Sequence, residues 1–120
     1  MAALTIWHNP NCSTSRFAVE EADAAGVEAE LRKYMLKAER PSRDEIVALL
    51  GKLEDPATDL VRRDAKFKKY GLTDDDVQTT DQIVRVILDN KMIMQRPLVV
   101  TADKAIIGRP KERIRDLLSS

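Results

Sequence analysis

Segments with strand patterns stand at the two ends of the chain, and this arrangement most constrains the fold. Leu4-Thr5-Ile6-Trp7 is an apolar run that Asn9-Pro10 ends, which predicts a short first strand. The pattern then predicts a helix from Ser13 or Thr14 to about Ala25, followed by Gly26. Apolar and charged residues alternate over 27–32, as in a half-exposed strand. The first 34 residues therefore predict a β-α-β unit.

The C-terminal end predicts two more strands and a helix. Leu98-Val99-Val100 is a β-branched run suited to a buried strand, and Ala105-Ile106-Ile107 follows a polar turn as its expected hairpin partner. Pro110 suits the first position of a final helix. We expect the apolar residues of that helix to face inward, namely Ile114, Leu117 and Leu118.

The middle of the chain is predicted to be helical. Ser42 and Glu45 have the spacing of a capping box before an apolar run. Two short helices are expected over 57–63 and 64–70, and a longer one from Thr79 or Thr80. The order βαβ, helices, ββα predicts an α/β fold with a thioredoxin-like mixed sheet. We expect one domain over residues 1–120, with an inserted helical subdomain at about 40–92.

Composition narrows the class of function. The chain has 120 residues, and 20 Lys and Arg balance 20 Asp and Glu, so no net positive charge favours nucleic acid. Apolar runs are shorter than the roughly 20 residues that a membrane span needs. The segment Met1-Ala2-Ala3-Leu4-Thr5-Ile6 lacks the basic start of a secretion signal. We therefore expect a cytoplasmic protein that contacts neither membrane nor nucleic acid.

Cys12 is the single cysteine and His8 the single histidine. An internal disulfide is therefore impossible, and we expect no metal site. Cys12 falls at the predicted start of a helix, where N–H groups and the positive end of the helix dipole favour a thiolate. His8 could add a donor or a charge. A phosphatase loop has an arginine after five intervening residues, where this chain has Ala18, and Ser15 stands where a dithiol motif has its second cysteine.

Three segments together resemble the glutaredoxin-linked arsenate reductase family. They are His8-Asn9-Pro10-Asn11-Cys12-Ser13-Thr14-Ser15-Arg16, Arg96-Pro97-Leu98-Val99-Val100 and Gly108-Arg109-Pro110. The resemblance covers nearly the whole chain and implies a thioredoxin-like fold with a helical insertion. It implies reduction of arsenate to arsenite through a cysteine–arsenic intermediate. Glutathione would be the co-substrate, glutaredoxin the partner protein, and no cofactor would be bound.

The resemblance also implies roles for individual residues. Cys12 would be the nucleophile and His8 a supporting catalytic residue, with Ser15 in a supporting position. Pro97 would be a cis proline facing Cys12. Three arginines would hold the substrate oxyanion. Two are Arg96 and Arg109, and aligning the apolar pair before the basic residue selects Arg62 as the third, with its neighbour Arg63 as the competing candidate. Arginine suits this task because its planar, permanently charged fork binds pairs of oxygens.

Three other functions are compatible with the same residues. A transcription regulator of the Spx type shares the fold, although Ser15 removes the second thiol of its redox switch. A glutathione-dependent monothiol transferase would use Cys12 without needing the arginines. A binding protein would leave Cys12 inert, as a small buried residue.

Overall fold

The computed structural model describes residues 4–119, except for the side chains of residues 91 and 119. Residues 1–3, on which the expectation of no secretion signal partly depends, lie outside the described residues. The chain divides into two compact units, one of residues 1–40 and 96–120 and the other of residues 41–95. Within residues 4–119, no helix is both long enough and apolar enough to cross a membrane.

The first unit is built on a four-stranded mixed sheet in the order β2-β1-β3-β4. The strands are β1 (Leu4–Trp7), β2 (Ala29–Arg32), β3 (Leu98–Val100) and β4 (Ala105–Ile107). β1 pairs in parallel with β2 and antiparallel with β3, and β3 forms an antiparallel hairpin with β4. The mixed sheet and the β3–β4 hairpin confirm the predicted fold class.

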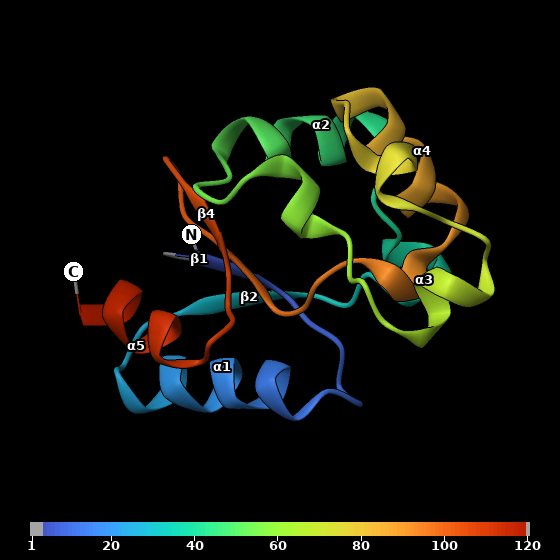
Figure 1. Ribbon diagram of the computed structural model, residues 1–120. Helices are drawn as coiled ribbons and strands as arrows, with labels where there is room; N and C mark the ends of the chain where they lie inside the picture. The colour runs from blue at the N-terminus through green and yellow to red at the C-terminus, as the bar shows by residue number, and fades with distance from the viewer. Residues whose placement is uncertain (1–3, 120) are drawn as a thin grey trace. The chain divides into compact units, whose positions relative to one another are not determined.

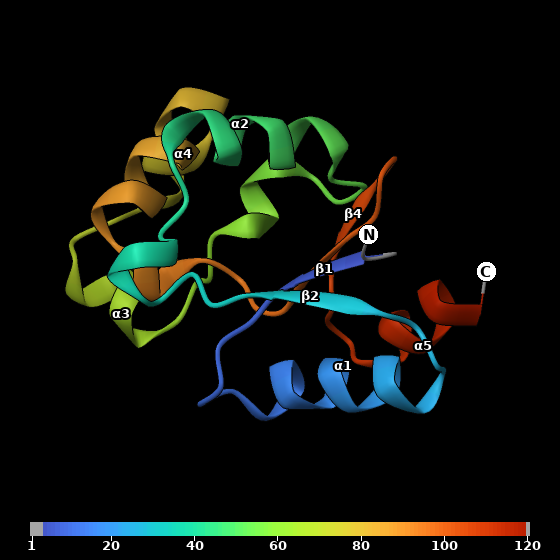
Figure 2. The ribbon, with the colours of Figure 1, turned by 180° about the vertical axis from the view of Figure 1, so that it is seen from behind.

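Two helices cover one face of this sheet, α1 (Ser13–Ala24) and α5 (Glu112–Ser119) (Figures 1 and 2). Small residues on α1 let the helix pack closely, since Ala18 and Ala22 are buried against the strands, as is Ile114 of α5. Leu117 and Leu118 are partly buried against the same core, in agreement with the predicted inward face. This packing fixes the start of α1 close to the end of β1.

The predicted start of the last helix was wrong by two residues. α5 begins at Glu112, and the preceding residues form a tighter turn in which Arg113 N–H donates to Pro110 O and Ile114 N–H donates to Lys111 O, each over 3.0 Å. These bonds span three residues rather than the four of an α-helix. Pro110 therefore lies in a turn before the helix.

The second unit contains three α-helices and three short 3-10 helices among its described residues. They are α2 (Arg43–Lys52), Ala57–Leu60, α3 (Ala65–Lys69), Asp74–Val77, α4 (Thr80–Asp89) and Lys91–Ile93. Ser42 and Glu45 form the predicted capping box, and Thr79 forms another with Gln82. The buried face of α4 includes Ile83, Val84, Val86 and Ile87. The apolar stripe thus packs this unit's own core.

A helix predicted over 57–63 is wrong in its second half. The 3-10 helix ends at Leu60, and Val61 then pairs with Met94 in an antiparallel bridge. Arg62 N–H donates to Ile93 O and Gln95 N–H to Leu60 O, each over 2.7 Å. Because this pairing joins residues about thirty positions apart, a local pattern could not reveal it. The backbone at Val61 is accordingly extended.

Candidate active site

Cys12 is the residue immediately before α1, in the loop that follows β1. Its extended backbone makes it the N-cap of the helix, and its carbonyl accepts the first helical hydrogen bond, from Arg16 N–H over 3.0 Å. Cys12 N–H donates to Asn9 O over 3.0 Å, which closes the loop. The side chain is 9% exposed. The sulfur of Cys12 thus lies near N–H groups of the first helical turn, which have no partner within the helix.

Positive charge surrounds the sulfur of Cys12. Arg109 Nη2 donates to Cys12 Sγ over 3.2 Å. Burial raises the pKa of the Cys12 thiol, but the Ser15 N–H, the charge of Arg109, the Arg96 side chain and the Thr14 N–H outweigh it and bring the pKa below its usual value of 9.0. A lowered pKa gives more thiolate at neutral pH, and the thiolate is the nucleophilic form.

The β3–β4 hairpin brings Arg96 and Arg109 together. Leu98 pairs with Ile107, so the two arginines lie beyond the same end of the hairpin. Arg109 Nε donates to Arg96 O over 2.8 Å, which joins the two segments directly. Two arginines that are far from Cys12 in the sequence therefore lie close to its sulfur.

Pro97 and Gly108 make close packing possible at this end of the hairpin. The Arg96–Pro97 peptide bond is cis, as the resemblance implied, and the Arg109–Pro110 bond is cis as well. Gly108 N–H donates to Pro97 O over 2.9 Å, and a Cβ atom at Gly108 would lie 2.8 Å from Pro97 Cγ. Only glycine leaves room for this approach.

His8 and Ser15 form a buried hydrogen bond beneath the loop. His8 Nδ1 lies 2.6 Å from Ser15 Oγ, and both residues are buried. Burial, with the positive charges of Lys33 and Arg16, lowers the pKa of His8 below its usual 6.5. His8 is therefore neutral at pH 7, and Ser15 O–H can donate to Nδ1. His8 contacts the loop through Ser15, so its expected role as a support for Cys12 is indirect in this geometry.

Asn9 is a residue of the loop to which the sequence analysis assigned no role. It is 4% exposed, and its N–H donates to Ser15 Oγ over 2.9 Å. Its side-chain Oδ1 accepts a hydrogen bond from Asn11 N–H over 3.0 Å, and its carbonyl accepts the Cys12 N–H. The available signal was the pair Asn9-Pro10, since asparagine often bonds the backbone two residues on.

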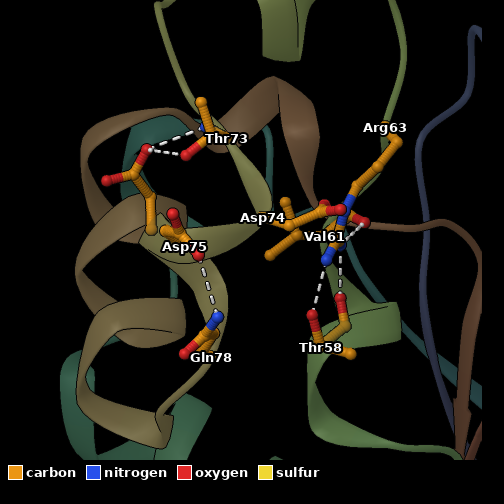
Figure 3. Close-up of polar contacts among 8 residues, drawn as sticks. Thr58, Val61, Arg63, Thr73, Asp74, Asp75 and Gln78 are labelled. Atoms are coloured by element: carbon orange, nitrogen blue, oxygen red, sulfur yellow. Dashed lines mark hydrogen bonds and ion pairs between the residues drawn. The ribbon is translucent and has the colours of Figure 1, made fainter.

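The third expected arginine, Arg62, lies in the second unit, whereas Cys12, Arg96 and Arg109 meet within the first. Its neighbour Arg63 is held by its own unit (Figure 3): Nη1 donates to the carbonyls of Thr58 and Val61, over 2.6 and 2.7 Å. Arg63 Nε also donates to Asp74 Oδ1 over 3.2 Å. Arg62 Nε lies 3.6 Å from an oxygen of Asp64. Because Arg63 Nη2 also donates to Thr58 Oγ1, each nitrogen of the Arg63 guanidinium has a partner within the second unit.

Comparison with known families identifies the family to which the chain belongs. Residues 7–117 match the ArsC family. The chain belongs to the ArsC family. This assignment covers both units, including Cys12 and all three candidate arginines.

Among residues 4–119, no three His, Cys, Asp or Glu side chains are grouped so that they could hold a metal ion.

ArsC relatives of known name are similar over almost the whole chain. An arsenate reductase of Escherichia coli is 33% identical over 119 residues, which cover 98% of this chain and 82% of the relative. An arsenate reductase of Neisseria meningitidis serogroup A is 33% identical and covers 98% of this chain and all of the relative. The solved arsenate reductase of Vibrio cholerae is 26% identical, with a TM-score of 0.82 over 96% of this chain and 97% of that one.

Proposed function

We propose that this ArsC protein is an enzyme that reduces arsenate to arsenite, with Cys12 as the nucleophile. The observation that supports this most strongly is the guanidinium of Arg109, which lies 3.2 Å from Cys12 Sγ. A thiolate beside arginines is suited to attack an oxyanion, because the cations offset the repulsion between two negative groups. The named arsenate reductases that match nearly the whole chain support the choice of oxyanion.

Arginine side chains would bind the oxygens of arsenate. Arg96 and Arg109 stand at the sulfur, and each offers a planar fork for two oxygens. We assign Arg62 as the third arginine in preference to Arg63. Arg63 would have to break its hydrogen bonds to Thr58 and Val61 before it could bind substrate. Pro97 would shape the wall facing Cys12.

The proposed reaction balances in four steps. The Cys12 thiolate attacks arsenic, an As–S bond forms, and one oxygen leaves as water. Glutathione then displaces a second oxygen as water and forms its own bond to arsenic. A glutaredoxin thiolate attacks the glutathione sulfur, and the electron pair of the broken S–As bond reduces As(V) to As(III). Water finally releases arsenite and frees Cys12.

External thiols supply both electrons in this scheme. The chain has one cysteine, so it cannot form a disulfide within itself. Glutathione and glutaredoxin end as a mixed disulfide, in which two sulfurs have lost the two electrons that arsenic gained. We further propose that the protein acts in the cytoplasm, where the glutathione pool is reduced. No bound cofactor is required.

The test is arsenate-dependent oxidation of NADPH, coupled through glutathione, glutaredoxin and glutathione reductase. Wild type, Cys12→Ser, Arg62→Ala and Arg63→Ala are assayed with arsenate and glutathione varied in turn. We expect turnover by wild type, none with Cys12→Ser, and a large rise in KM for arsenate with Arg62→Ala. Arg63→Ala should lower thermal stability while leaving KM for arsenate nearly unchanged. A larger KM effect from Arg63→Ala would reverse the assignment.

A glutathione-dependent transferase is the second candidate. The lowered pKa of Cys12 supports it as well, since a thiolate also attacks disulfides. It would need no oxyanion site, so the two arginines at the sulfur would serve only to lower the pKa of Cys12. Glutathionylation of Cys12 without any arsenate turnover would favour the transferase.

A further inference from the structure

A groove lined partly by charged side chains includes Ser13, the residue that follows Cys12. Its cavity of about 230 Å³ lies between the first two turns of α1 and the turn before α5. We call it the α1 groove, and it is lined by Ser13, Thr14, Arg16, Phe17, Glu20 and Lys111. All of these residues belong to the first unit, as does Cys12. Because the lining includes Ser13, a molecule in this groove would contact the residue that follows Cys12 in the chain.

Two parts of the lining of the α1 groove are close in the chain to groups that contact the Cys12 sulfur. Thr14 N–H hydrogen-bonds the sulfur of Cys12, so the helical turn that forms one wall of the groove also contacts the nucleophile. On the other side, Lys111 follows Arg109 by two residues, and Arg109 donates to the same sulfur. A ligand that extends from Cys12 could thus enter the groove without crossing another element.

The charges of the α1 groove favour an anionic ligand that also carries one cation. Arg16 and Lys111 supply two positive charges and Glu20 one negative charge. Lys111 Nζ lies 5.1 Å from the centre of the Phe17 ring, which keeps the ammonium at the groove wall. A second cavity further along α1 contains Glu21 and Arg115, but these two bond each other over 2.9 Å. Their charges are already matched.

We propose that the α1 groove is the binding site for glutathione when its sulfur reacts at Cys12. Glutathione carries two carboxylates and one ammonium, the reverse of the groove's two cations and one carboxylate. Lys111 and Arg16 bind the carboxylates, Glu20 binds the ammonium, and the central cysteine of the tripeptide is directed to Cys12. This inference rests on the proposed use of glutathione as co-substrate.

The test measures disulfide exchange, so it requires no arsenate turnover. The Cys12 thiolate attacks one sulfur of glutathione disulfide, a Cys12–glutathione disulfide forms, and one glutathione leaves as its thiolate. The same attack on 2-hydroxyethyl disulfide involves no charged ligand. Both rates are followed by intact mass. The rate with glutathione disulfide divided by the rate with 2-hydroxyethyl disulfide is the ratio that reports recognition of glutathione. It cancels changes in the pKa or nucleophilicity of Cys12.

Charge variants separate specific binding from general attraction. Lys111→Glu should lower the ratio by about fivefold or more, because one surface ion pair is lost and a repulsion replaces it. Glu20→Gln should also lower the ratio, since it removes the partner of the ammonium. General attraction of an anion predicts the opposite for Glu20→Gln. Lys104→Glu, in the turn between β3 and β4, is the matched control and should leave the ratio nearly unchanged.

The outcomes separate this proposal from the proposed function. An unchanged ratio for Lys111→Glu, or a rise for Glu20→Gln, would overturn the glutathione site even in an active arsenate reductase. Both expected decreases without arsenate turnover would support the site and overturn the arsenate assignment. In an active enzyme, Lys111→Glu should further raise KM for glutathione and leave KM for arsenate nearly unchanged.

Discussion

Removal of the Arg109 charge should raise the pKa of Cys12. Arg109 Nη2 lies 3.2 Å from the sulfur, and because Arg109 is exposed whereas Cys12 is buried, the dielectric of water gives the lower limit of their attraction. At that distance and dielectric, opposite unit charges attract by about 1.3 kcal/mol. One pKa unit corresponds to about 1.36 kcal/mol. Arg109→Ala should therefore reduce the thiolate fraction about tenfold or more at a pH below both pKa values.

The pH dependence of alkylation measures this shift. Iodoacetamide reacts with the thiolate, so the rate rises through the pKa of Cys12. Wild type should show a midpoint below 9.0, and Arg109→Ala a higher midpoint than wild type. Arg109→Lys keeps the charge and should give a smaller rise. Arg115→Ala removes an arginine that Glu21 holds, and it should leave the midpoint unchanged. Equal midpoints for wild type and Arg109→Ala would refute the reasoning.

Three further predictions concern the hydrogen bonds and the packing of the residues around Cys12. Ser15→Ala should destabilise the fold by about 1–3 kcal/mol in urea unfolding, because Asn9 N–H loses its buried acceptor; no loss would contradict the network. The free energy of unfolding should fall as pH falls below about 6.5, since the unfolded chain binds a proton that native His8 resists; His8→Gln should flatten this dependence. Gly108→Ala should cost about 1–3 kcal/mol through contact with Pro97, and an unchanged melting temperature would exclude the clash.

Local patterns predicted much of the fold because they report burial within single elements. The alternation over 27–32 and the apolar run at 98–100 became β2 and β3. The two errors have different causes. Val61 leaves its predicted helix to pair with Met94, a distant residue whose contact leaves no periodic signal in the local sequence. Pro110 enters a local turn whose hydrogen bonds span three residues, and it therefore precedes the helix that it was expected to begin.

The site divides in the same way. The position of Cys12 at a helix start followed from the residues near it, and the structure agrees. Arg109 lies 97 positions from Cys12, and only resemblance to a family connected them before the β3–β4 hairpin brought them into contact. The buried hydrogen bonds of Asn9 depend on a folded loop. The structural role of Arg63 likewise became visible only through its contacts with Thr58 and Val61.

Direct measurement of arsenite tests the central claim, that Cys12 reduces arsenate with electrons from external thiols. Arsenic species are separated and quantified while NADPH consumption is followed in the glutaredoxin-coupled assay. Wild type should form one arsenite for each NADPH oxidised, because the oxidation of NADPH and the reduction of arsenate each transfer two electrons. Cys12→Ser should form no arsenite above background. Arsenite formation by Cys12→Ser at the wild-type rate, or none by wild type, would contradict the account.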